Sequence, residues 1–129
     1  MTTTNRRPWT PAENAALVRL YFEMLDRITA QEGLNKAAMI RHEQRVLTGP
    51  AGTERGPLSY RSRGSIEAKL MNASAAHAAI DPNAVTMASH GYKAWGNYQA
   101  SLKDAMHAEW LKRVDCDYLN GMNPADGIS

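Results

Sequence analysis

The chain is poor in cysteine and in aromatic residues, and both shortages exclude classes of protein. Its 129 residues include one cysteine, one phenylalanine and 7% aromatic residues in total. A single thiol, Cys116, cannot form an internal disulfide or a cysteine-based zinc site, and it suits a reducing, cytoplasmic setting. No apolar run approaches the length of a membrane span, and the N-terminus MTTTNRRPW lacks the apolar segment of a signal peptide.

Catalytic and metal-binding motifs are scarce as well. The sequence has no P-loop and no glycine-rich dinucleotide motif, and its four histidines lack the spacing of zinc ligands. Glu67 and Lys69 match half of the E-x-K motif of metal-dependent nucleases, but the nearest second carboxylate, Asp81, lies at the far end of the same predicted helix. We therefore expect no cofactor, no metal and no enzymatic activity, and we keep a Mg²⁺-dependent nuclease centred on Glu67 as the catalytic alternative. The histidines are His42, His77, His90 and His107.

The composition favours one small helical domain. The apolar fraction is 43% and the charged fraction 22%, and alanine and methionine supply much of the apolar content. The formal net charge is only +2, but it is unevenly distributed. Residues 1–70 contain 11 Lys and Arg against 7 Asp and Glu, whereas residues 71–129 contain 4 against 6, so the balances are +4 and −2. The excess of cations therefore lies in the first half.

Helix signals divide the chain into four helical segments. The stretch WTPAE forms a capping box in which Thr10 is the N-cap, and apolar residues at helical spacing then predict a helix over 11–30. Asn35 can cap a second helix that reaches Leu47, and Asn97 can cap a fourth over 98–114. Residues 48–60 contain three glycines and two prolines and predict a long exposed loop that carries Glu54 and Arg55.

The resulting fold prediction is all-α: a small helical domain with a three-helix, helix-turn-helix-like core and a C-terminal helix. Within a single domain over 1–129, four parts are expected. They are a flexible basic arm over 1–8, the three-helix core over 9–80, a connecting segment with the fourth helix over 81–114, and a loose tail over 115–129.

The third predicted helix, over 62–80, presents two stripes. Ile66, Leu70, Ala73 and His77 share one face, and a neighbouring stripe of small and polar residues contains Ser65, Lys69 and Asn72. A helix that enters a DNA groove needs such a stripe, because short side chains permit close approach while lysine and asparagine reach phosphates and base edges. The alternative is an ordinary amphipathic helix whose polar side faces water.

Two other segments could contact a nucleic acid. The stretch GYKAWGNYQASL, residues 91–102, combines aromatic residues with Lys93 and Gln99, a mixture that can stack on bases or grip a backbone, or that can fold over the helices instead. Arg6 and Arg7 lie in the basic arm, which can follow a DNA backbone or remain a solvated terminus.

Four stretches resemble a known family: WTPAENAALVRLYFEML, NKAAMIR, RSRGSIEAKLMNASA and GYKAWGNYQASL. Together they are similar to a helical module that often precedes HNH-type nuclease domains in bacterial and phage restriction-like proteins, and the W-T-x-x-E opening resembles a Myb/SANT-type helix-turn-helix. The resemblance spans about residues 7–112, implies DNA association and places the reading helix near 62–78. Two departures stand out: the chain stops where a nuclease domain would follow, and the 48–60 loop replaces a short turn.

The sequence therefore predicts a non-enzymatic DNA-binding protein that contacts double-stranded DNA through the helix at 62–78. The alternative, from another class, is a protein-interaction factor such as a phage-borne inhibitor of a bacterial defence or nuclease complex, which would use exposed methionines such as Met39, Met87 and Met122. The predicted DNA contacts are Arg6, Arg7, Arg61, Arg63, Ser65, Lys69, Asn72, Lys93 and Gln99.

Overall fold

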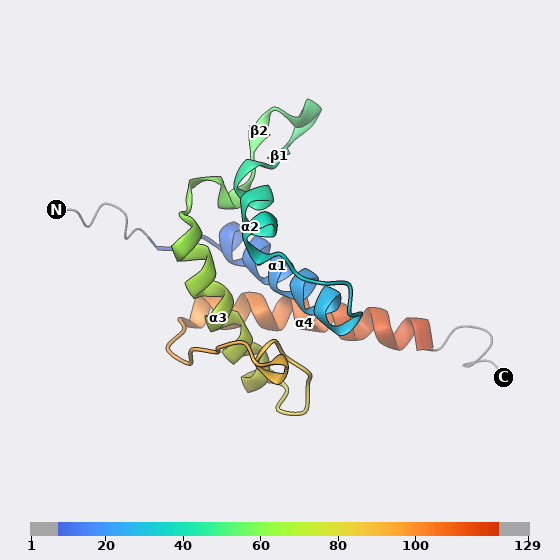
Figure 1. The fold of residues 1–129 in the computed structure, drawn as a ribbon. Coiled ribbons are helices and arrows are strands. Elements are labelled where there is room, and N and C mark those ends of the chain that lie inside the picture. The colour runs from blue at the N-terminus through green and yellow to red at the C-terminus, as the bar shows by residue number, and fades with distance from the viewer. Residues whose placement is uncertain (1–7, 122–129) are drawn as a thin grey trace.

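The computed structural model describes residues 8–121, with side chains described for 8–115. Four α-helices account for most of it, which confirms the predicted small all-α domain (Figure 1). None of the described helices has both the length and the apolar character needed to cross a bilayer. The helices are α1 (Pro11–Thr29), α2 (Lys36–Arg45), α3 (Arg63–Ile80) and α4 (Ala100–Gly121).

Local capping explains where the first three helices begin. At α1 the hydroxyl of Thr10 accepts from the amide of Glu13 at 3.1 Å, and the Glu13 carboxylate accepts from the amide of Thr10 at 2.8 Å. The side chains of Asn35 and Ser62 each accept a hydrogen bond from the amide three residues later, at 3.0 and 3.1 Å. These side chains satisfy amides that the helices leave unpaired, so the predicted starts of the three helices are confirmed.

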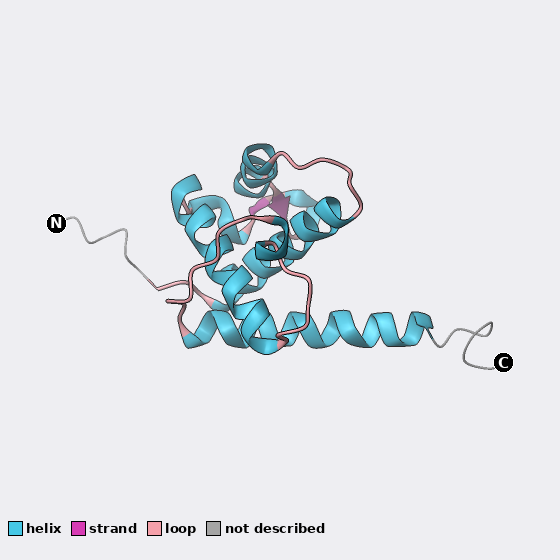
Figure 2. Ribbon diagram, turned by 60° about the horizontal axis from the view of Figure 1, so that its bottom comes forward, coloured by secondary structure: helices cyan, strands magenta, loops and turns pink. Residues whose placement is uncertain are grey.

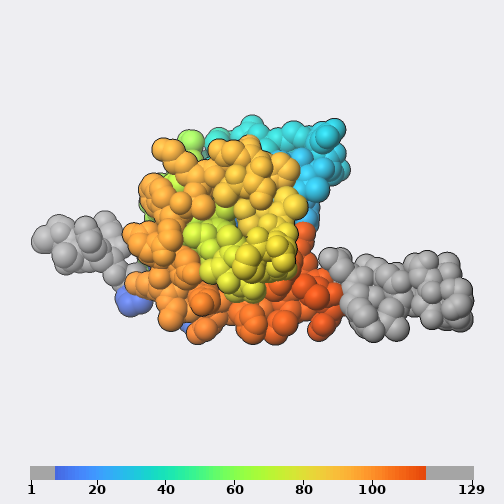
Figure 3. Space-filling model, turned by 90° about the horizontal axis from the view of Figure 1, so that it is seen from below, coloured from blue at the N-terminus to red at the C-terminus, as the bar shows by residue number. Residues whose placement is uncertain are grey.

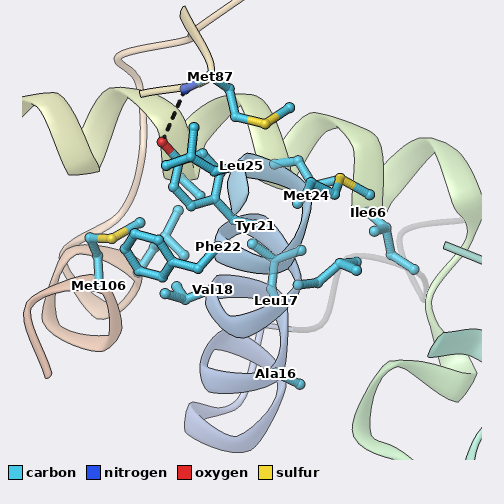
Figure 4. Close-up of a cluster of buried hydrophobic side chains, with 14 of the residues drawn as sticks. Ala16, Leu17, Val18, Tyr21, Phe22, Met24, Leu25, Ile66, Met87 and Met106 are labelled. Carbon is cyan, nitrogen blue, oxygen red and sulfur yellow. Dashed lines mark hydrogen bonds between the residues drawn. The ribbon is translucent and has the colours of Figure 1, made fainter. Parts of the chain in front are cut away.

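The core surrounds α1, which packs against both α3 and α4 (Figure 4). The predicted apolar face of α3 is buried in full, from Ile66 to His77. From α4, Leu102 and Met106 reach the same core, as their helical spacing predicts. Met87, one of the methionines expected to be exposed, is also a core residue. The buried residues of α1 include Leu17, Val18, Leu20, Tyr21, Phe22, Met24 and Leu25.

A buried polar chain crosses this core. The hydroxyl of Tyr21 lies 2.8 Å from Nδ1 of His77 and accepts from the amide of Met87 at 3.3 Å (Figure 4). Nε2 of His77 has no hydrogen-bond partner among the described residues. Burial lowers the pKa of His77 to about 4 and raises the pKa of Tyr21 to about 12, so both groups are neutral in the folded protein.

Two predicted boundaries near α4 are wrong. Asn97 does not cap this helix, since α4 begins three residues later and the carbonyl of Gln99 accepts from the amides of Leu102 and Lys103. The helix also continues to Gly121, beyond the predicted end at 114, and its C-terminal half extends past the other helices (Figure 2). The loose tail expected from 115 is thus helical as far as 121, and residues 122–129 lie outside the described residues.

The connection between α2 and α3 is an ordered β-hairpin rather than the predicted loop or a short helix-turn-helix turn. Strand β1 (Leu47–Thr48) pairs antiparallel with β2 (Glu54–Arg55), with Leu47 opposite Arg55 (Figure 1). Gly56 is needed beside it, because a Cβ there would lie 2.5 Å from a methyl carbon of Val46. A 3₁₀ turn at Pro50–Gly52 lies between the strands, and another at Pro57–Tyr60 leads into α3.

Candidate nucleic-acid interface

Arg61, a predicted DNA contact, is instead locked inside the joint between α1 and α3. Its Nε and Nη2 atoms lie 2.8 and 2.9 Å from the two carboxylate oxygens of Glu13, and Nη2 also donates to the carbonyl of Pro8 at 2.9 Å. Both charged residues are buried, with 7% of Arg61 and 5% of Glu13 exposed. The planar guanidinium matches a carboxylate in two-point geometry, and a buried charge requires such a partner. The expectation that Arg61 faces DNA is therefore wrong.

Lys69 is turned toward Trp9 rather than outward. Its ammonium lies 5.3 Å from the centre of the Trp9 ring, and the Arg61 guanidinium lies 4.7 Å from the same ring. The side chain is half-buried, and burial together with the charge of Arg61 lowers the pKa of Lys69. These contacts are cation–π interactions, so Trp9 holds two cations at the start of the domain while it packs on the edge of the core.

Asn72, the third residue of the polar stripe predicted to enter a DNA groove, is also buried, so it cannot reach a base edge. Its amide donates to the carbonyl of Trp95 at 2.9 Å and to Oδ1 of Asn97 at 3.3 Å. The amide of Trp95 donates in turn to the carbonyl of Met71 at 3.0 Å. Two of the four stretches that carry the family resemblance, RSRGSIEAKLMNASA and GYKAWGNYQASL, thus contact one another, and Asn72 holds the later stretch against α3.

The first turn of α3 remains exposed. The Arg63 side chain is 61% exposed and its Nε lies 3.6 Å from a carboxylate oxygen of Glu67, one helical turn later. Gly64 is exposed, and nothing lies within 4 Å of the position that a Cβ would occupy there. No acidic residue lies in this turn, whereas the first turn of α1 contains Glu13. The positive end of the α3 dipole therefore carries a cation in place of the usual acid.

The hairpin carries a second exposed cation, Arg55. The guanidinium of Arg55 lies 5.1 Å from the centre of the Tyr60 ring, and Tyr60 is 67% exposed. Tyr60 is exposed two residues before the N-cap Ser62, so exposed residues of the hairpin side and of the first turn of α3 are close together in the sequence. We name this group of residues the Arg63 surface, consisting of Arg55, Tyr60, Ser62, Arg63 and Ser65.

Of the remaining predicted contacts, Ser65 belongs to this surface, Lys93 and Gln99 lie on another segment, and the two in the basic arm lie outside the described residues. Ser65 is half-exposed in the first turn of α3, so the structure brings it together with Arg63. Lys93 and Gln99 are exposed on the segment between α3 and α4, where Lys93 shares a pocket with Met71. Seen from below, this orange segment lies beside the yellow-green part of α3 (Figure 3). Arg6 and Arg7 lie outside the described residues.

Residues that could hold a metal do not gather in the described part of the chain. Within it, no group of three or more His, Cys, Asp or Glu side chains has the geometry of a metal site. Glu67, from the E-x-K triplet, is beside Arg63, while Asp81 is the C-cap at the opposite end of α3. These two carboxylates are separated by most of the helix, so the described residues do not pair them around a shared ion.

Comparisons with protein families, curated proteins and solved structures found no match for the chain. Sequence reasoning missed Tyr60 and did not assign Arg55 a role, because neither belongs to a periodic stripe. The signal that could have found them is the pairing of Arg55 with an aromatic residue five positions later, across the single turn that begins with Gly56 and Pro57.

Proposed function

We propose that this is a non-enzymatic DNA-binding protein that holds the phosphate backbone of a duplex on the Arg63 surface. The observation that carries the proposal is the exposed first turn of α3, where Arg63 replaces an acid at the positive end of the helix. A cation at this position is unfavourable for the helix alone. A bound phosphate reverses that effect, because it pairs with both the arginine and the helix amides.

The contact between Arg63 and Glu67 does not prevent this exchange. The two charges are 3.6 Å apart on an exposed helix face, and pairs of this kind contribute about 0.5 kcal/mol or less. A phosphate offers Arg63 a two-point, charge-assisted partner in place of this contact. Arg55, steadied by Tyr60, lies on the neighbouring hairpin and can neutralise a further phosphate of the same backbone.

Arg61 and Glu13 support this surface without touching the ligand. Their two-point contact fixes the residue before the Ser62 cap against the first turn of α1. A binding surface gains affinity when its support is rigid before the ligand arrives. The R-S-R-G-S stretch therefore supplies one supporting arginine, Arg61, and one exposed arginine, Arg63. This division of roles is consistent with the resemblance to the module that precedes HNH-type nucleases.

Binding of this kind has little sequence preference. Lys69 and Asn72, which were expected to reach base edges, are engaged with Trp9 and with the 95–97 segment. Phosphate contacts position a protein on a duplex but carry no sequence information directly. We therefore expect affinity that falls steeply with salt and that changes little between duplexes of different sequence.

The test measures the affinity for a short duplex across a salt series by fluorescence anisotropy. Arg63→Ala and Arg55→Ala should each weaken binding and reduce the salt slope by about 1. Lys112→Ala is the matched control, since it removes the same charge from a side chain on α4 that is 73% exposed. Equal losses in all three variants, or no binding at low salt, would contradict the proposal.

A second candidate, the protein-interaction factor, is favoured by one observation. Leu47 on the hairpin is 58% exposed and lies near the exposed Tyr60 side of the molecule. The methionines expected to serve this role do not support it, because Met39 is half-buried, Met87 is in the core and Met122 lies outside the described residues. This candidate predicts salt-tolerant capture of one protein, lost in Leu47→Glu, together with no duplex binding at low salt.

A further inference from the structure

A pocket of about 260 Å³ lies between the start of α2, the middle of α3 and the segment that follows α3. Leu70 and Met87 are its buried residues, and Met71 and Tyr92 are half-buried around them. Figure 3 shows the orange segment after α3 beside the yellow-green helix and next to the cyan part of the chain, which contains the start of α2. The residues that line the pocket are Lys36, Leu70, Met71, Met87, Gly91, Tyr92 and Lys93.

The charged groups of this pocket are all positive. Lys36 and Lys93 line it, and none of the described lining residues is acidic. Lys36 is the first residue of α2, whose first turn contains no acid, so the positive end of the helix dipole adds to the charge of the ammonium. The Lys36 ammonium lies 5.5 Å from the centre of the Tyr92 ring. The pocket is therefore suited to an anion.

The rest of the lining is apolar and polarisable. Met71 and Met87 contribute thioethers, which make favourable contacts with aromatic rings, and Tyr92 offers a ring of its own. The volume is slightly below the range of about 300–1,000 Å³ that is typical of pockets for drug-sized ligands. A ligand with one planar ring system and a negative charge matches both the small apolar lining and the positive charge of this pocket.

We propose that this pocket binds one nucleobase together with its phosphate. The base lies against Met71, Met87 and Tyr92, and the phosphate is held between Lys36 and Lys93. The ligand can be a free nucleotide or an unstacked nucleotide of a bound strand, and the second source depends on the proposed function. Met71 lies eight residues after Arg63, about 12 Å along the helix or between three and four base pairs along a duplex, so one strand can span both sites.

The first arm of the test uses deoxyadenosine monophosphate, followed by NMR of the methionine methyl groups. Addition of deoxyadenosine monophosphate should shift the resonances of Met71 and Met87. Deoxyadenosine and inorganic phosphate, each added on its own, should bind more weakly. Lys36→Gln should weaken nucleotide binding by about tenfold, the effect of losing one charge-assisted contact. Lys112→Gln, which changes a distant exposed lysine in the same way, should have no effect.

The second arm uses a duplex that contains 2-aminopurine, whose fluorescence rises when the base leaves the stack. Binding should increase this fluorescence in the unaltered protein. In Met71→Trp, which fills the pocket, the increase should disappear while the affinity for the duplex is retained. If Met71→Trp does not fold, as judged by circular dichroism, Lys36→Gln serves in its place.

The outcomes separate this inference from the proposed function. A signal in either arm supports the pocket. The arm that gives the signal shows whether the ligand is a free nucleotide or a nucleotide of a bound strand. Nucleotide binding without any duplex binding retains the pocket and contradicts the proposed function. Duplex binding with no fluorescence change and no nucleotide binding contradicts the pocket alone, and silence in both arms overturns both.

Discussion

Arg61 and Arg63 are two positions apart in the sequence and have opposite environments in the structure. Arg61 is 7% exposed and held by two oxygens of Glu13, whereas the Arg63 side chain is 61% exposed beside a half-exposed Glu67. The contrast shows that a cation cluster in a sequence does not define a binding surface. An arginine becomes a buried structural residue, rather than an exposed one, when another part of the chain supplies a buried carboxylate that pairs with it.

The largest effect should follow from breaking the buried pair. Arg61→Met leaves the Glu13 carboxylate buried without its main partner, which should reduce the free energy of unfolding by about 3–5 kcal/mol. Urea unfolding measures this loss. The double variant Arg61→Met with Glu13→Gln should recover part of it, because no charge is then stranded. A loss below about 1 kcal/mol for the single variant would show that the pair is not a structural lock.

The next effect concerns another ionisable group, His77, which the core holds neutral. Its pKa falls from 6.5 when exposed to about 4 when buried, so the unfolded chain binds more protons between these values. The stability that this group contributes is therefore complete above pH 6.5 and is lost as the pH falls toward 4, by at most about 1.4 kcal/mol per pH unit. Urea unfolding across this range measures it, and His77→Leu should have a shallower dependence. Identical slopes would contradict this assignment.

A smaller effect is expected at Asn72, whose amide fastens the 95–97 segment to α3. Asn72→Ala should reduce the free energy of unfolding by about 1–2 kcal/mol, since the carbonyl of Trp95 loses a donor near the protein interior. Hydrogen exchange should accelerate at the Trp95 amide, which bonds to Met71, and remain unchanged in α1. Uniform acceleration across all helices would instead indicate global destabilisation.

The smallest effect on stability should come from Arg63. Arg63→Ala removes an exposed side chain with one weak ion pair, so the free energy of unfolding should change by no more than about 0.5 kcal/mol. Duplex affinity should nevertheless fall. Arg61 thus contributes mainly to stability, whereas Arg63 contributes mainly to binding. Thermal unfolding beside the salt series tests both, and a large loss of stability would place Arg63 with Arg61 as a structural residue.

Local patterns predicted the helices well and their surroundings poorly. The starts of α1, α2 and α3 depend on caps within four residues, and the buried face from Ile66 to His77 depends on helical spacing, so both are visible in the sequence. The pairing of Arg61 with Glu13 spans 48 residues and the contact of Asn72 with Trp95 spans 23. No period or cap encodes such distant partners, and two-residue strands like those of the hairpin are too short to produce a pattern.

The most direct test of the DNA-binding account is a titration of the ¹⁵N-labelled protein with a short duplex at low salt, followed by amide chemical shifts. The account predicts shifts concentrated at Ser62–Ser65 and at the hairpin strands, with those of buried α1 residues unchanged. Shifts confined to the charged groove between α1 and α4, near Arg19 and Lys112, would contradict it.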